Sequence, residues 1–413
     1  MKKIITTASL AALGAASVQA ATPLDRSYYA PSPGLSSQER AKWWSVGASL
    51  RGFFDDNINT SPAGFKQDSY GFEVSPSLGA HFAAEQTFID LTYQYSGRYF
   101  ESRKDNQWDH THVANLAIAH SFSETMKLDI KDTFAYAQEP EVFESGTTIT
   151  GPLLRRSQLD NLHNRGSINF QAQLTELFST AMGYENGYYD YQESGAGSYS
   201  ALLDRREHLA RIDFRWHALP TTIALVGYQY GFVEYQSKES LLAGIPRVAK
   251  TITDPESRDN RSHYVYVGAD HQFNGQFTGT IRLGTQITEY PDAVDFLGAK
   301  QDRDTVSPYA EASVNYTYME NSFIQLGVRH AKNQTDVALA SAIDPAATLD
   351  QETTTVYGVV SHRITPKLTG NLVGQAQNSR FNGGVAADKT DDLFLIGANL
   401  SYQINENFST ELG

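Results

Sequence analysis

Apolar and polar residues alternate with a period of two along much of the chain after Trp43. Between Ile89 and Tyr99, isoleucine, leucine, tyrosine and a glycine share one face, while aspartate, threonine, glutamine, serine and arginine share the other. The same rule holds in Ala210–Trp216, Phe277–Ile287, Val306–Tyr318 and Phe394–Tyr402. A helix would need apolar residues spaced about 3.6 apart. The pattern therefore predicts β-strands that each expose one face to an apolar environment.

The predicted strands are joined alternately by short turns and long loops. Strands of soluble sandwiches average about five or six residues, whereas these run to ten or more, as a tilted crossing of a bilayer requires. The short turns are Ala84–Gln86, Ser123–Thr125, Thr175–Leu177, Leu219–Thr221, Asn274–Gly275, Glu320–Asn321, Thr365–Lys367 and Asn405–Asn407. The longest loops are Glu139–Arg165, Ser237–Asn260 and Asp336–Gln351.

This alternation is typical of transmembrane barrels, in which short turns face the periplasm and long loops face outside. The sequence thus predicts an all-β fold, a transmembrane antiparallel up-and-down β-barrel of about 16–18 strands. Gly413 falls within what resembles the start of a strand, so we expect a barrel truncated at the C-terminus.

The N-terminal residues predict three segments. Residues 1–20 are expected to be a signal peptide, with Lys2 and Lys3 before an apolar run and Ala20 at the cleavage site. The alternative, a buried helix, is disfavoured because no acidic residue precedes Asp25. Residues 21–42, rich in proline and serine, are expected to form a flexible periplasmic leader, and residues 43–413 the barrel.

Composition and charge narrow the class further. The formal net charge of −14 argues against nucleic acid as a partner, because phosphate binding needs a basic surface. The mature segment has no apolar stretch long enough for a membrane-spanning helix. Cysteine is absent, yet the 23 tyrosines and 21 phenylalanines are plentiful. Many aromatics with few long apolar runs favour a barrel in contact with outer-membrane lipid.

The polar faces of the strands predict a charged interior, because a barrel of this size leaves space that side chains alone do not fill. The pore-lining residues that we expect are Arg98, Lys131, Arg211, Asp213, Arg215, Arg282, Glu311 and Arg329. Four further charged residues share these faces: Asp90, Lys127, Asp129 and Asp270. One interpretation is mutual pairing across strands. The other is a basic field that favours anionic solutes or an acidic polysaccharide.

Aromatic residues gather near the predicted strand ends. They are Trp43, Trp44, Phe53, Phe54, Tyr99, Phe100, Tyr188, Tyr189 and Tyr290. Rings at the two membrane–water boundaries are typical of barrels. We therefore interpret them as anchoring girdles rather than as a sugar-binding track.

Motifs of enzymes and metal sites are mostly missing. His110 and His112 beside Asp109 offer an acid–base or metal cluster, but no partner nucleophile is in view, and polar residues at a strand end are the simpler interpretation. The stretch Asp55-Asp56-Asn57, followed by Asn59, offers oxygen ligands for calcium, although such a sequence more often forms a turn. No Gly-x-Ser-x-Gly elbow is present. We predict no catalytic residue, no cofactor and no metal, and hence not an enzyme.

The early strand Val46–Leu50 runs into Phe53-Phe54-Asp55-Asp56-Asn57-Ile58-Asn59. Together with the signal peptide and leader, this stretch resembles a family of β-barrel porins found in some bacteria near exopolysaccharide-export genes. The resemblance implies an outer-membrane barrel associated with exopolysaccharide biogenesis and transport, and it supplies no catalytic residues.

Two functions stay open at this point. The first is a porin-like channel, or a barrel that accompanies exopolysaccharide export. The second is an outer-membrane enzyme or surface-binding protein with its site on the long extracellular loops. The expected partners are outer-membrane lipid, the barrel-assembly machinery and small solutes or polysaccharide.

Overall fold

The computed structural model describes residues 43–58, 66–137, 161–294, 298–334, 348–383, 387–405 and 408–413. The predicted signal peptide and leader lie outside the described residues, as do most of the loops Glu139–Arg165 and Asp336–Gln351. So does Asn59.

Seventeen strands make up almost all of the described chain. They are β1 (Trp44–Asp55), β2 (Ser69–Ala83), β3 (Thr87–Phe100), β4 (Trp108–Ser121), β5 (Met126–Ala137), β6 (Asn161–Gln173), β7 (Phe178–Tyr191), β8 (Arg205–Leu219), β9 (Thr222–Tyr235), β10 (Asn260–Gln272), β11 (Phe277–Glu289), β12 (Thr305–Met319), β13 (Ser322–Asn333), β14 (Asp350–Thr365), β15 (Leu368–Asn382), β16 (Thr390–Gln403) and β17 (Ser409–Leu412). The strand count and the predicted all-β architecture are confirmed.

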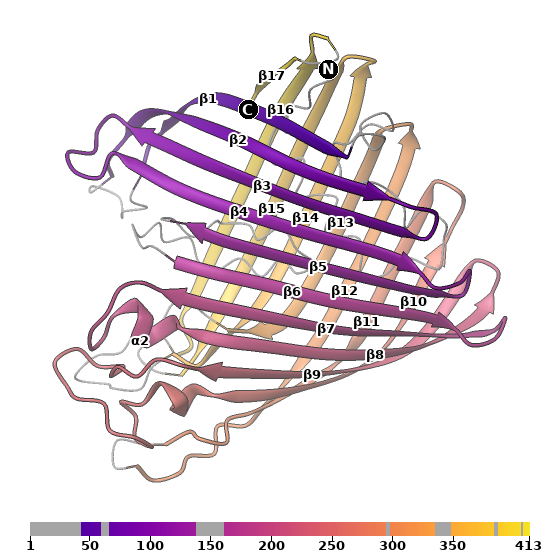
Figure 1. Ribbon diagram of the computed structural model, residues 1–413. Coiled ribbons are helices and arrows are strands. Elements are labelled where there is room, and N and C mark those ends of the chain that lie inside the picture. The colour runs from indigo at the N-terminus through magenta and orange to yellow at the C-terminus, as the bar shows by residue number, and fades with distance from the viewer. Residues whose placement is uncertain are drawn as a thin grey trace.

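Each strand pairs antiparallel with the next one along the chain, so the sheet is a continuous up-and-down meander. Figure 1 shows the sheet curled so that β1–β9 face β10–β16 across an interior, with β1 and β16 at the same side. Among the described residues, the predicted short turns lie at one end of the strands, and the loop Ser237–Asn260 lies at the other. Among the described residues, no pairing joins β1 to β16 or β17.

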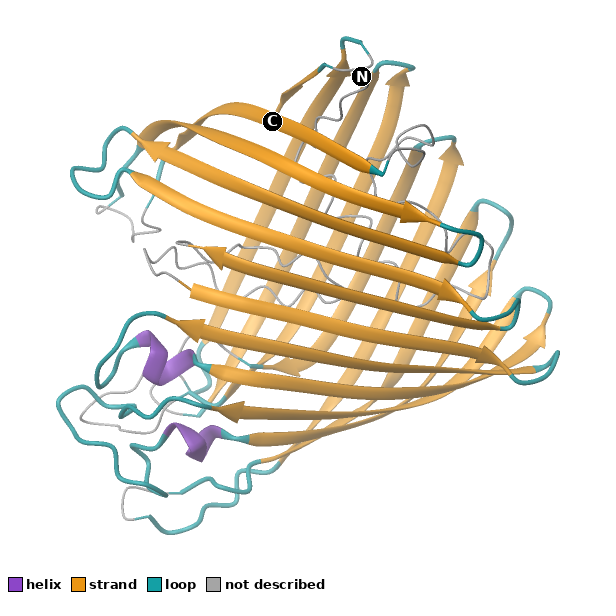
Figure 2. Cartoon of the chain, viewed as in Figure 1, coloured by secondary structure: helices purple, strands orange, loops and turns teal. Residues whose placement is uncertain are grey.

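The helices are short and lie among the long loops (Figure 2). Within the described ranges they are α2 (Tyr199–Leu203), capped by the Ser198 side chain, and η2 (Pro255–Arg258), capped by Asp254. No helix in the described ranges is long and apolar enough to cross a membrane.

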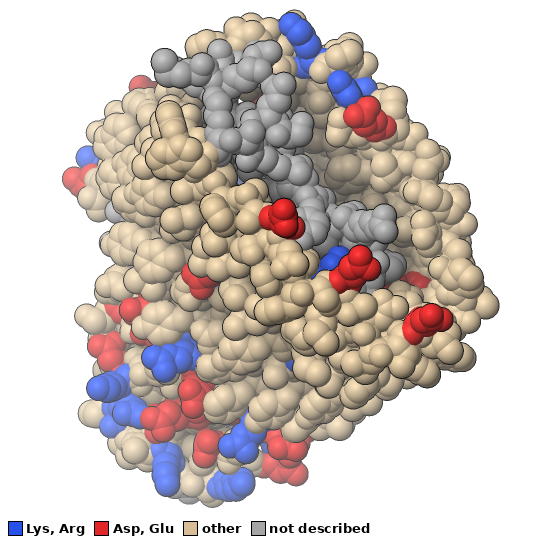
Figure 3. All heavy atoms as spheres, turned by 45° about the vertical axis from the view of Figure 1, so that its right-hand side comes forward, with Lys and Arg blue, Asp and Glu red and all other residues tan. Residues whose placement is uncertain are grey.

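The two faces of the sheet differ sharply in polarity, because side chains alternate across a strand. Outward-facing apolar side chains such as Phe394 and Ile396 are 77% and 82% exposed, and Leu283 is 51% exposed. Figure 3 shows charged side chains gathered toward one end, beside a broad surface with few of them. An exposed apolar band of this extent is stable only against lipid.

The predicted aromatic girdles are partly right. Trp44 and Phe54 are exposed on the outer face of β1 as expected, and Trp43, which precedes the strand, is 75% exposed. Phe100 and Tyr290 are instead buried, at 1% and 2% exposure, so their assignment to a girdle was wrong. Phe100 packs under the Arg103 guanidinium, 3.9 Å from the ring centre, and Tyr290 follows the end of β11, where strand alternation no longer fixes the direction of the side chain.

Candidate functional site: the inner wall

The inner wall, meaning the strand side chains that point away from the apolar outer surface, carries the charged residues that alternation predicts. Asp213, Arg215 and Arg282 are buried there. The other residues predicted to line a pore lie on the same face of their strands: Arg98, Lys131, Arg211, Glu311 and Arg329. The structure therefore brings the predicted set to one face. Contact with a conducting path stays a prediction.

Two buried arginines share one buried aspartate on this wall. The Arg215 Nη2 atom lies 2.5 Å from Asp270 Oδ2, and the Arg282 Nη2 atom lies 3.1 Å from Asp270 Oδ1. Asp270 is only 2% exposed, so both ion pairs are shielded from water. The three side chains come from β8, β10 and β11. These inward charges therefore pair across strands, which was one of the two interpretations of the charged inner wall.

Tyrosine hydroxyl groups donate hydrogen bonds to the neighbouring carboxylates. The Tyr266 hydroxyl donates to Asp213 Oδ1 over 2.5 Å, and the Tyr309 hydroxyl donates to Glu311 Oε2 over 3.2 Å. The Tyr266 ring lies over Gly227 so closely that a Cβ atom there would come within 2.3 Å of the ring. A glycine at this position lets the ring lie flat against the wall, and any side chain would push it inward.

The remaining predicted residues have fewer or weaker partners. Arg98 pairs with Glu73 at 3.3 Å, and Arg211 donates to Asn169 Oδ1 over 2.7 Å. Lys131 is exposed and neighbours Asp129 on β5. Within the described part of the chain, Arg329 has no ion pair, and its Nε and Nη1 atoms are buried without a hydrogen-bond partner.

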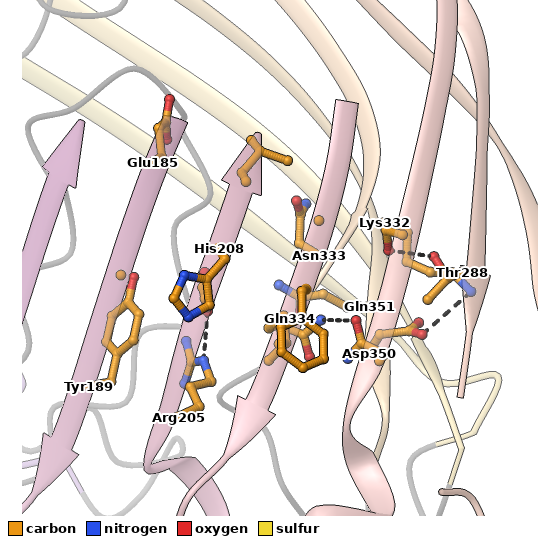
Figure 4. A pocket seen from close by; sticks show the side chains of 18 of the residues that line it. Glu185, Tyr189, Arg205, His208, Thr288, Lys332, Asn333, Gln334, Asp350 and Gln351 are labelled. Atoms are coloured by element: carbon orange, nitrogen blue, oxygen red, sulfur yellow. Dashed lines mark hydrogen bonds and ion pairs between the residues drawn. The ribbon is translucent and has the colours of Figure 1, made fainter. Parts of the chain in front are cut away.

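A cavity of about 180 Å³ opens on the inner wall at the long-loop end of β6–β14 (Figure 4). Charged side chains on its lining pair with one another. These pairs are Arg165–Glu185 at 3.1 Å, Arg205–Glu207 at 2.7 Å and Lys332–Asp350 at 3.4 Å. The Tyr290 hydroxyl also donates to Asp350. Sequence alternation did not single out Arg205, Lys332 and Asp350 because they lie where strands run into loops. Arg165 and Glu185 lie within β6 and β7, whose sequences alternate less clearly.

Hydrogen bonds join the loop after β7 to the loop after β9. The Gly197 N–H donates to the Ser240 carbonyl over 2.8 Å, and the Arg258 guanidinium donates to the Leu202 carbonyl over 2.5 Å. Arg258 is 1% exposed and stacks on the Tyr235 ring at 4.2 Å. These contacts make the two loops one packed unit over this end of the barrel.

Two carboxyl groups in these loops hold the ends of strands. Asp204 accepts the Tyr191 N–H over 2.8 Å, and Asp259 accepts the Tyr235 N–H over 2.8 Å. Burial raises the pKa of Asp204 to about 6 and that of Asp259 to about 7. Nearby acidic side chains add to both shifts. They are Asp190 and Glu239 beside Asp204, and Glu234, Glu256 and Asp292 beside Asp259.

The loop unit is therefore expected to loosen as pH rises. A carboxyl group whose pKa is raised in the folded state contributes its full stability when the pH is below the pKa of the unfolded state, which is about 4. This stability is lost as the pH rises through the pKa of the folded state. Amide hydrogen exchange, corrected for its intrinsic pH dependence, should show more protection at Tyr191 and Tyr235 at pH 5 than at pH 8. Asp204→Asn with Asp259→Asn keeps an acceptor oxygen and should remove the difference. Equal protection of the parent at both pH values would contradict this expectation.

The two other candidate sites from the sequence, one around Asp109 and one around Asp55, make structural contacts. Asp109 is buried against Arg103 at 2.6 Å, while His110 and His112 point to the other face and bond the hydroxyl groups of Tyr95 and Tyr93. The aspartate and the histidines therefore do not form one cluster.

The Asp55 side chain accepts the Asn57 N–H over 3.0 Å, which is the turn that its sequence favours. In the described ranges no group of three or more metal-ligating side chains converges.

No family model matches the chain, and no curated protein matches it. Solved structures to which the chain is similar include the FrpB iron transporter from Neisseria meningitidis (F5-1 variant), with 11% identity over 90% of this chain and 62% of that chain and a TM-score of 0.46. The copper transporter OprC has 10% identity over 89% of this chain and 60% of that chain, with a TM-score of 0.40. A bacterial polysaccharide outer membrane secretin has 7% identity over 87% of this chain and 98% of that chain, with a TM-score of 0.37. The chain thus spans about six tenths of the two transporters.

The class of protein follows from the geometry of the chain itself. An antiparallel meander of long strands, an apolar outer surface and a polar inner wall define an outer-membrane β-barrel.

Proposed function

We propose that the protein is a conduit for hydrophilic solutes across the outer membrane, either as a porin-like channel or as a barrel that accompanies polysaccharide export. The observation that supports this function is the inner wall, which is polar along the strands while the outer surface is apolar. On β15, for example, Gln375 and Gln377 face inward and Leu372 faces outward. A wall of this kind suits an interior that holds water and polar solutes.

The chemistry of the wall over β13–β15 supports an uncharged, hydroxylated solute. Many of the inward side chains there are amides and hydroxyls, which lie beside Arg329 and the apolar Val359 and Val373; the amides and hydroxyls include Gln325, Gln351, Thr353, Thr355, Gln375, Gln377 and Ser379. Amides both donate and accept hydrogen bonds, as sugar hydroxyl groups do. The polysaccharide implied by the family resemblance fits this surface. An anionic solute has less support from Arg215 and Arg282, which already share Asp270, than from Arg329, which has no ion pair among the described residues.

Liposome swelling tests this proposal. Vesicles that contain the refolded protein should swell in isosmotic neutral monosaccharide faster than protein-free vesicles. Asn371→Trp adds bulk to the inner wall and should slow the swelling, whereas Leu372→Trp adds the same bulk to the outer surface, where the leucine is 49% exposed, and should leave it unchanged. A folded barrel that gives no swelling would contradict the proposal.

A further inference from the structure

Three residues of the first three strands meet on the inward face near the short-turn end. The Ser45 hydroxyl of β1 lies 2.9 Å from His81 Nε2 of β2, within hydrogen-bond distance, and His81 Nδ1 bonds Asp90 Oδ1 of β3. His81 and Asp90 are buried at 6% and 5% exposure, while Ser45 is only half-buried. The hydroxyl is thus the member of this group that is most open to the interior.

The carboxylate fixes the roles of the two ring nitrogens. An ionised carboxylate accepts hydrogen bonds only, so Nδ1 of His81 carries the proton that it donates to Asp90. The lone pair on Nε2 is then free to accept the Ser45 proton. A nucleophile within hydrogen-bond reach of a base, and a carboxylate that orients the base, are the geometry of serine hydrolases, which is recognised by arrangement rather than by order in the chain.

The sheet register accounts for this meeting. Ser45 lies opposite Gly79, and His81 lies opposite Asp90. A Cβ atom on Gly79 would stand 2.4 Å from Ser45 Oγ and 2.8 Å from His81 Nε2. Only glycine therefore leaves room for the hydroxyl and the imidazole to touch.

Other pairs of a hydroxyl and a histidine show what a merely structural role looks like. Ser179 bonds His217 Nε2 at 3.0 Å on the same inward face, but no carboxylate within the described ranges bonds its other ring nitrogen. His330 contacts both Thr354 and Glu352, yet it lies on the outward face and its partner is a secondary hydroxyl. The Ser45 group differs from these in combining a primary hydroxyl, a carboxylate and the inward face.

We propose that Ser45, His81 and Asp90 form an acyl-transfer triad that hydrolyses carboxylic esters carried by solutes in the interior, an activity that goes beyond the proposed conduit. Ser45 Oγ attacks the ester carbonyl carbon, and its proton passes to His81 Nε2. The carbon–oxygen bond to the alcohol then breaks, and the alcohol leaves with that proton. Water attacks the acyl-serine in the same way, which releases the carboxylic acid and restores Ser45.

The surroundings of the triad define the substrate class. The inward positions of β1 and β2 beside Ser45 carry no large side chain; they are Gly47, Ser49, Ser75, Ser77 and Gly79. Next to them, Asn115 donates to Thr92 over 3.4 Å and accepts from Thr133 over 2.9 Å, so the adjoining wall offers hydrogen bonds, and Lys131 and Asp129 of β5 lie beyond it on the same face. A small floor beside a polar wall fits a short acyl group on a hydroxylated alcohol. A lipid ester would approach from the outward face instead.

A fluorophosphonate probe, which phosphorylates activated serines, tests the proposal on the full chain refolded in detergent. We expect the parent to be labelled and to hydrolyse p-nitrophenyl acetate. Ser45→Ala should abolish both, and Asp90→Asn should lower the hydrolysis rate by about 10⁴-fold, as loss of the orienting carboxylate does in serine hydrolases. Ser179→Ala is the matched control and should be labelled like the parent.

Heat-modifiable migration on a gel shows that each variant is folded before it is compared. A folded parent that neither reacts with the probe nor hydrolyses the ester would overturn the proposal. So would labelling that survives Ser45→Ala, or labelling that depends equally on Ser179.

Discussion

Replacing Asp270 by alanine is expected to destabilise the folded barrel by about 3–5 kcal/mol, the cost of removing one partner of a buried ion pair. The change leaves Arg215 and Arg282 on the inner wall without the carboxylate that both of them contact. Arginine stays charged at any relevant pH, so neither side chain can escape the cost by losing its proton. Urea unfolding of the protein in lipid vesicles, followed by heat-modifiable migration, measures the effect.

Asp388→Asn is the matched control for this change, because Asp388 has a φ of 61° and asparagine removes the charge while tolerating this left-handed backbone. Asp388 contacts Arg380 at 2.6 Å, but the two side chains are 77% and 59% exposed. Exposed ion pairs contribute about 0–1 kcal/mol, so this variant should unfold close to the parent. Equal, small effects of both substitutions would show that the Asp270 cluster is not buried in the folded protein.

The fold could be predicted from the sequence because its main signals are local. The alternation in Ile89–Tyr99 gave β3, and small polar groups such as Asn274–Gly275 gave the hairpin turns. Side-chain direction in a strand depends only on parity, so Arg282 and Arg329 were assigned to the correct face without knowledge of their neighbours.

The partners of these residues could not be predicted in the same way. Arg215 and Asp270 are 55 positions apart, and their contact depends on the register of three strands. The same holds for Ser45 and His81, which no contiguous motif connects. A register difference of one residue would have moved either partner to the opposite face. The loops were least predictable, because Arg258 owes its contact to a neighbouring loop and Asp259 owes its contact to the end of β9, and neither follows a repeating pattern.

Two neighbouring residues on β3 allow a direct test of whether solutes pass along the inner wall. Thr92 faces inward beside Asn115, whereas Leu91 faces outward and is 50% exposed. The chain contains no cysteine, so a single introduced thiol is the only target for a charged methanethiosulfonate reagent.

Single-channel conductance in a planar bilayer should be present in the parent, in Thr92→Cys and in Leu91→Cys. Adding the reagent should then reduce the current through Thr92→Cys by a large fraction, because selectivity and current are set by groups on the path itself. The parent and Leu91→Cys should be unaffected. Absence of conductance from the folded parent, or a block in Leu91→Cys with none in Thr92→Cys, would contradict the account.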